Sequence, residues 1–105
     1  KENEGKNELA TTIISVFELY AGAYKSKDRD QKVKAVKTLI ERVIVLDLSS
    51  TGAEEAGRLR AELELKGNII EIRDLLIGAI SLKEGYSLKT NNKKHFSRIS
   101  NLTLI

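Results

Sequence analysis

The sequence predicts an α/β protein, a three-layer sandwich around a mainly parallel sheet, and two observations carry this prediction. First, segments rich in β-branched residues alternate with segments whose apolar residues recur at helical spacing. Second, residues 43–48 (VIVLDL) are apolar almost without interruption, which is typical of a strand covered on both faces, as in a parallel sheet. The predicted order is strand, two helices, strand, two helices, strand, a basic link and a strand, and such alternation favours parallel pairing.

The first strand is predicted over residues 9–14 (LATTII), followed by a helix from Ser15 to about residue 25. Ser15 and Glu18 have the S-x-x-E spacing of a capping box, which predicts the start of that helix. The helix is apolar on nearly all sides, so we expect it to be buried on two sides or to contact a partner. The surface expected to make that contact surrounds three aromatic residues, Phe17, Tyr20 and Tyr24.

The remaining elements follow from periodicity and from residues that end helices. Helices are predicted over about 30–42, 52–66 and 72–84, with strands over 43–48, 86–90 and 102–105. Thr51 and Glu54 have capping-box spacing, and Gly67 and Gly85 stand where helices end.

Composition bounds the function. The chain has 105 residues, 41% of them hydrophobic, which suits one small domain, and it has no cysteine and one histidine. A disulfide framework, a thiolate zinc site, a cysteine nucleophile and a multi-histidine metal site are therefore excluded. No glycine-rich phosphate loop or serine nucleophile elbow is present. No apolar run is long enough to span a membrane, so we expect a cytoplasmic protein with no membrane partner.

The net charge of +3 is concentrated toward the end of the chain. Residues 1–66 have as many acidic as basic side chains, whereas residues 67–105 have six basic and three acidic ones. Residues 89–98 contain four cations, a histidine and no acid. Such a segment can neutralise phosphates, although a solvated lysine-rich loop would have the same composition.

Two carboxylates and a group of amides are candidates for chemistry. Glu18 lies in an otherwise apolar helix, but the capping box alone explains it. Asp74 lies in the first turn of a helix, where the helix dipole favours an acid, and small residues continue its face. Thr90, Asn91 and Asn92 follow a predicted strand, where asparagines usually form turns. We expect His95 to be a surface or helix-end residue.

Taken in order, these residues form a more specific pattern. Ser15-Val16-Phe17-Glu18-Leu19-Tyr20-Ala21-Gly22, then Asp74-Leu75-Leu76-Ile77-Gly78-Ala79, then Thr90-Asn91-Asn92 with His95-Phe96 and Arg98-Ile99 resemble the signatures of the PIN domain. The likeness is greatest to VapC-type toxins of prokaryotic toxin–antitoxin pairs, and it covers residues 9–105. It implies a PIN-like fold, a metal-dependent endoribonuclease, an RNA substrate, a cognate antitoxin and a homodimer.

The resemblance also implies roles for individual residues. Glu18 and Asp74 would be catalytic and would hold Mg²⁺ or Mn²⁺, since hard cations prefer oxygen ligands. Asn92 would orient water or metal. Thr90 and Ser15 would support the site, and the residues expected to contact the RNA backbone are Lys93, Lys94 and Arg98.

The sequence departs from the family at its start. Similar proteins begin with a strand that ends in a metal-binding Asp, followed by a helix, and this sequence has neither. Ile72 stands where many relatives have an acid, and Gly78 replaces the more usual Ala. We therefore expect residues 1–105 to be a single PIN-like domain that is incomplete at its N-terminus, most simply a fragment. A decayed gene, or a strand supplied by another chain, are the alternatives.

Two other functions fit the residues. One is a truncated or decayed, non-catalytic domain that acts only through protein–protein interaction. The other is a nucleic-acid binder that uses the basic segment alone.

Overall fold

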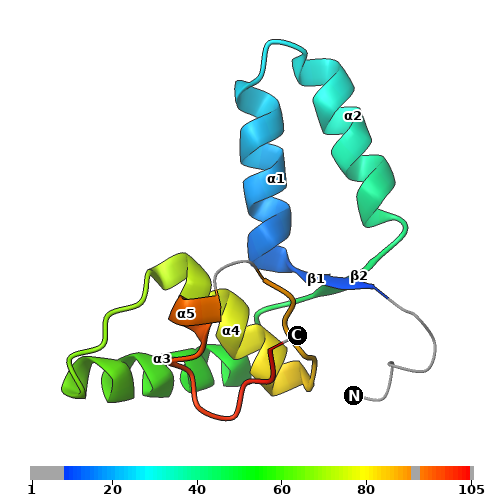
Figure 1. Cartoon of the computed structure of the whole chain (residues 1–105). Helices are drawn as coiled ribbons and strands as arrows, with labels where there is room; N and C mark the ends of the chain where they lie inside the picture. The colour runs from blue at the N-terminus through cyan, green and yellow to red at the C-terminus, as the bar shows by residue number, and fades with distance from the viewer. Residues whose placement is uncertain (1–8, 91–92, 105) are drawn as a thin grey trace. The chain divides into compact units, whose positions relative to one another are not determined.

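The computed structural model describes residues 9–90 and 93–104, and Figure 1 traces the order of their elements. These residues fall into two compact units, residues 9–47 (the first unit) and residues 48–104 (the second unit), and each is described by itself.

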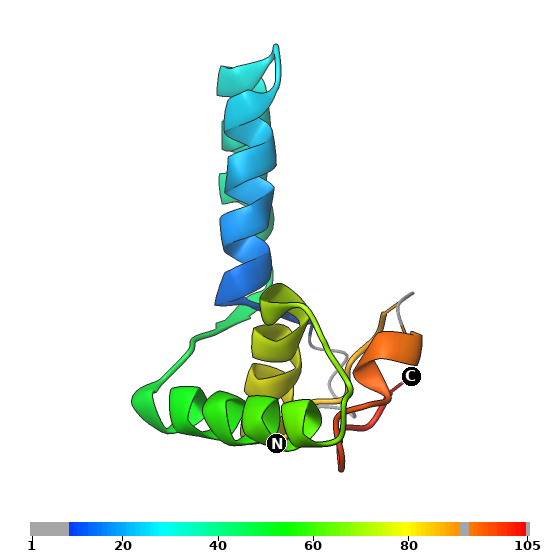
Figure 2. The same cartoon turned by 90° about the vertical axis from the view of Figure 1, so that its left-hand side faces the viewer.

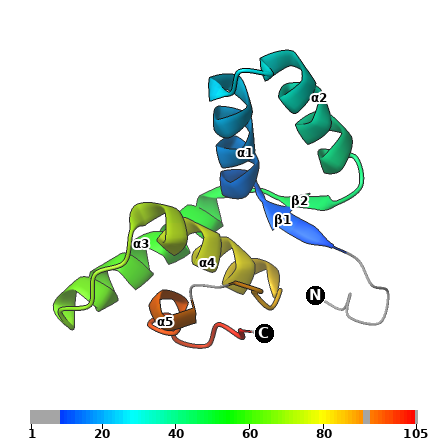
Figure 3. The ribbon, with the colours of Figure 1, turned by 45° about the horizontal axis from the view of Figure 1, so that its top comes forward.

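The first unit is a parallel strand pair joined by a helical hairpin. It contains β1 (Ala10–Thr12), α1 (Ile13–Lys25), α2 (Arg29–Ile40) and β2 (Ile44–Leu46). The strands pair in parallel with Ala10 opposite Ile44 and Thr12 opposite Leu46. The helices pack side by side, as Figure 3 shows, and the buried apolar residues of this unit are Val16, Ala23, Val36 and Leu46.

The start of α1 differs from the prediction. The helix begins at Ile13, and the side chain of Thr12 accepts a hydrogen bond of 3.1 Å from the Ser15 backbone N–H. Thr12 is therefore the N-cap, and the predicted capping box of Ser15 and Glu18 is wrong. The β-branched run through residue 14 favours a strand locally, but the Thr12 cap ends the extended backbone two residues earlier.

The second unit packs two long helices against a shorter C-terminal segment. It contains α3 (Ser50–Leu65), α4 (Ile72–Glu84) and α5 (Lys93–Phe96), and Figure 2 shows α4 crossing α3. The core residues of this unit come from all three helices and the chain after α5: Ala56, Leu59, Leu63, Leu75, Ile77, Ala79, Ile80, Phe96 and Ile99.

In the second unit, the C-terminal ends of α3 and α4 agree with the prediction, whereas the N-cap of α3 differs from it. Gly67 (φ 75°) follows α3 and Gly85 (φ 77°) follows α4, both in the left-handed region that favours glycine. The N-cap of α3 is Ser49, whose side chain accepts from the Gly52 N–H, so the predicted capping box of Thr51 and Glu54 is wrong.

The two short strands predicted near the C-terminus are reduced to one parallel bridge. It joins Leu88 and Leu104, and the Leu88 N–H donates to the Thr103 carbonyl at 2.9 Å. The basic segment predicted as a link contains the short helix α5. The α/β class and the parallel pairing are confirmed, although the sheet of the described residues has two strands. No helix in this part of the chain has the length and apolar character needed to cross a membrane.

Candidate functional site

Asp74 is a carboxylate buried inside the second unit. It lies in the first turn of α4 and is 2% exposed. Burying a carboxylate is costly unless charged or hydrogen-bonding groups compensate it. Its two oxygens face different side chains: Arg73 Nη2 lies 3.2 Å from Oδ1, and His95 Nδ1 lies 4.0 Å from Oδ2. The N-cap position of α4 is Glu71, whose side chain makes no capping hydrogen bond, and Asp74 is the third residue of the helix.

His95 joins the site through α5. The sequence predicts a surface or helix-end residue, and its side chain is indeed 45% exposed. The structure adds that its ring faces the carboxylate of Asp74, a contact that sequence reasoning missed. The only signal for it is its place in the third motif, because no local periodicity relates α5 to the start of α4.

The basic residues of the same segment divide into two kinds. Lys93 and Lys94 are exposed in α5, and their contact with an RNA backbone stays a prediction. Arg98 is half-buried, and its guanidinium donates a hydrogen bond to the backbone carbonyl of Ile69, in the loop before α4. Arg98 therefore fixes the loop that precedes Asp74.

The other predicted site residues are placed as follows. Thr90 is half-buried at the end of the described segment, and Asn91 and Asn92 lie outside the described residues. Ser15 and Glu18 belong to the first unit, one turn apart in α1, and both are half-buried. The Thr12 hydroxyl donates to Ser15 Oγ at 3.3 Å, so Ser15 supports the start of α1. The structure thus brings Asp74 together with His95 and Arg73, within one unit.

Asp74 is chemically suited to hold a divalent cation, but the described residues do not make a complete site. Mg²⁺ and Mn²⁺ prefer carboxylate oxygens, and a buried carboxylate beside an imidazole provides one such ligand and one nitrogen donor. Across residues 9–90 and 93–104 no three His, Cys, Asp or Glu side chains gather as a metal cluster.

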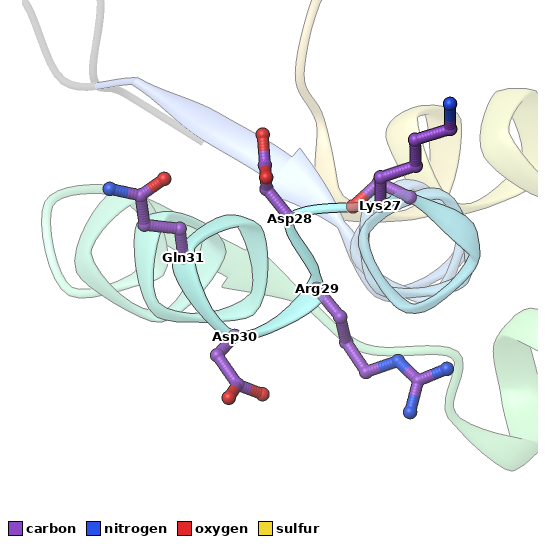
Figure 4. A pocket seen from close by; sticks show the side chains of 6 residues that line it. Lys27, Asp28, Arg29, Asp30 and Gln31 are labelled. Atoms are coloured by element: carbon purple, nitrogen blue, oxygen red, sulfur yellow. The ribbon is translucent and has the colours of Figure 1, made fainter.

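A shallow hollow of about 480 Å³ lies at the charged turn between α1 and α2. Figure 4 shows its lining, which comes from consecutive residues 26–31. The lining carries both signs of charge, from Lys27 and Arg29 and from Asp28 and Asp30, and the Arg29 Nε donates to the Tyr24 carbonyl at 3.2 Å. None of the predicted site residues lines this hollow.

Comparison with known proteins agrees with the motifs. The PIN domain model matches residues 1–102. The chain belongs to the PIN-domain family. Ribonuclease VapC2 of Rickettsia felis is 40% identical over 98 residues, which cover 93% of this PIN domain and 73% of that protein. The tRNA(fMet)-specific endonuclease VapC of Shigella flexneri is 29% identical over 100 residues, covering 95% of this chain and 74% of that one.

A solved structure supports the same fold. The crystal structure of VapBC2 from Rickettsia felis, bound to a DNA fragment from the promoter, superposes with a TM-score of 0.88 at 38% identity. The match covers 98% of this chain and 77% of that chain. The PIN domain described here therefore spans about three quarters of the length of the relatives it matches.

Proposed function

We propose that this PIN domain acts as the endoribonuclease toxin of a toxin–antitoxin system and cleaves RNA phosphodiester bonds. The observation that carries the proposal is the buried Asp74 carboxylate, which faces His95 at the motif positions that resemble those of the ribonuclease family. The alternative, a domain limited to protein–protein interaction, gives no reason to bury a carboxylate in this setting, and the similarity to ribonucleases does not favour it.

We further propose Mg²⁺ or Mn²⁺ as the cofactor, with Asp74 as an oxygen ligand; Glu18 stays a candidate ligand from the motif resemblance alone. A bound cation of this kind polarises a phosphate and lowers the pKa of an attacking water. Arg73 lies beside Oδ1 of Asp74, and His95 lies beside Oδ2. Ser15, Thr90 and Asn92 stay supporting candidates from the motif resemblance alone.

The RNA backbone is held by the basic segment in this proposal. Lys93 and Lys94 are exposed and can meet phosphates without sequence preference, while Arg98 fixes the loop before α4. An enzyme that acts on cellular RNA works in the cytoplasm, which is the compartment we propose.

The proposed protein partners are a cognate antitoxin and a second copy of this chain. The antitoxin is supported by the similarity to VapBC assemblies. The exposed apolar residues of α1, among them Phe17 and Leu19, provide a surface for such contacts.

The test is metal-dependent cleavage of RNA by the chain and its Asp74→Asn variant. We expect cleavage in Mg²⁺ or Mn²⁺ that EDTA abolishes, and a loss of at least about a hundredfold in Asp74→Asn, since a ligand and its charge are removed. Lys83→Gln, a change at an exposed position on the same helix, is the control. Calorimetric titration with Mn²⁺ gives a second readout. Cleavage that persists in EDTA, or in a variant lacking both Asp74 and Glu18 carboxylates, would contradict the proposal.

A further inference from the structure

The basic residues of the α1–α2 hairpin are concentrated around its turn: the whole hairpin, residues 13–40, has six basic and three acidic side chains, a net charge of +3. Residues 25–37 contain six basic and two acidic side chains, a net charge of +4 against +3 for the whole chain. The even balance over residues 1–66 conceals this, because the compensating acids lie elsewhere. All six basic residues are exposed: Lys25, Lys27, Arg29, Lys32, Lys34 and Lys37.

Aromatic rings are exposed on the same hairpin. Phe17 is 68% and Tyr24 53% exposed, and the rings of Tyr20 and Tyr24 lie 6.5 Å apart between centroids. Phe17, Tyr20 and Tyr24 follow one another at helical spacing, so they form an aromatic stripe along α1.

Rings and lysines meet in one hollow of about 250 Å³ between the two helices. Tyr24 of α1 lines it together with Asp30, Val33, Lys34 and Lys37 of α2. Asp30 lies one helical turn before Lys34, so the acid is at one end of the hollow and Lys37 at the other. An aromatic ring, an apolar side chain, one carboxylate and two lysines therefore line one hollow within the first unit.

Exposed rings beside basic side chains are typical of proteins that bind single-stranded nucleic acid. An exposed ring stacks on a base, and neighbouring lysines neutralise the adjoining phosphates. A duplex offers no free base to stack, so a site of this kind would favour unpaired nucleotides.

We propose that Tyr24, Lys34 and Lys37 form a binding site for single-stranded RNA, separate from the residues around Asp74. Tyr24 stacks on one base, and the two lysines hold the phosphates beside it. The inference rests on the proposed function, because that function makes RNA the ligand. It adds that the hollow binds an unpaired segment of the RNA. A segment of an acidic protein is the competing occupant.

The experiment measures RNA binding by the full chain in EDTA, so that cleavage does not interfere. The probes are a fluorescein-labelled oligouridine of about twelve nucleotides and an RNA duplex of the same length, followed by fluorescence anisotropy. Tyr24→Leu is expected to weaken oligouridine binding about tenfold, and Tyr24→Phe to retain it, since the ring is kept. The duplex is expected to bind more weakly and to be insensitive to Tyr24→Leu.

The lysines are tested through the salt dependence. Replacing Lys34 and Lys37 by glutamine is expected to reduce the slope of log affinity against log salt by about 1.4, or about 0.7 for each phosphate that is no longer neutralised. The matched control replaces Lys66 and Lys83, two exposed lysines outside the hairpin, and should keep the original slope. Circular dichroism melting curves verify that each variant is folded.

The outcomes separate this inference from the proposed function. Oligouridine binding that is unchanged in Tyr24→Leu and in the lysine variant would overturn the inference, even if Asp74→Asn abolishes cleavage. If these variants instead bind an oligoglutamate peptide more weakly while their RNA binding is unchanged, the hollow binds an acidic protein. That result would also overturn the inference. If the chain cleaves no RNA but the hairpin variants lose RNA affinity, the proposed function fails and this inference stands.

Discussion

Gly78 is a buried glycine of α4 with close neighbours on the side where a Cβ would lie. A Cβ built on Gly78 would clash with Cδ1 of the buried Ile99, and it would contact Leu102 and Phe96 at 3.6 Å. The glycine therefore lets the chain after α5 pack directly against the backbone of α4. An alanine at this position would require the Ile99 side chain to move.

The clash at Gly78 predicts a specific coupling. Gly78→Ala alone is expected to lower the free energy of unfolding by about 1 kcal/mol, because the strain exceeds the gain in helix propensity. In an Ile99→Val background, which removes the clashing methyl group, the same change should raise it by up to about 1 kcal/mol. Urea unfolding of the four proteins measures this cycle, and additive effects would contradict the predicted contact.

Asp74 and His95 show how far single residues can be predicted. The motif and the place in the first turn of a helix identify Asp74 as a candidate, and its burial agrees with a role beyond capping. The pairing with His95 depends on how α5 packs on α4, which is a long-range contact that neither periodicity nor turn residues encode. The role of Glu18 stays a prediction.

At the scale of elements, the sequence predicts the glycines that end helices better than the residues that start them. Gly67 and Gly85 both adopt positive φ, a conformation that is unfavourable for residues with a side chain. Because few other residues fit there, the glycines mark where the helices end. N-caps are less certain because several Ser and Thr residues compete within a few positions, as at Ser49 and Thr51. At α1, Thr12 and Ser15 are both possible caps. The prediction starts the helix at Ser15, whereas in the structure Thr12 is the cap and the helix starts at Ile13.

The cap of α3 is open to a direct test. Ser49→Ala is expected to cost about 1 kcal/mol of stability, because the Gly52 N–H loses its acceptor. Thr51→Ala should cost clearly less, since the Thr51 hydroxyl contributes only the exposed hydrogen bond of 3.1 Å to Ser49 Oγ. Thermal unfolding of the two variants compares them, and a larger loss at Thr51 would restore the capping box predicted from the sequence.

At the scale of the whole molecule, the two units differ in how much they bury. Seven residues of α4 are buried, among them Leu75, Ala79 and Ile80 at 1% exposure or less, whereas α2 buries Val36 alone. The sequence predicts both helices from the same periodicity. The sequence does not predict which of the two helices is more deeply buried, because burial depends on neighbours that are distant along the chain.

This difference predicts the order of local opening. Backbone amides of α4 are expected to exchange hydrogen with solvent more slowly than those of α2, by about tenfold or more, since opening α4 exposes more apolar surface. Native-state hydrogen exchange followed by NMR measures both helices in one experiment. Equal protection of the two helices would show that the chain opens only as a single unit.

The parallel pairing of β1 with β2 has a consequence for the rate at which the chain folds. Ala10 and Ile44 are partners across the whole α1–α2 hairpin, so the strands cannot pair until a long loop has closed. The hairpin itself forms from contacts between consecutive helices, and once formed it holds the ends of that loop near each other. The helices that display Tyr24 and the lysines thus also shorten the conformational search that precedes strand pairing.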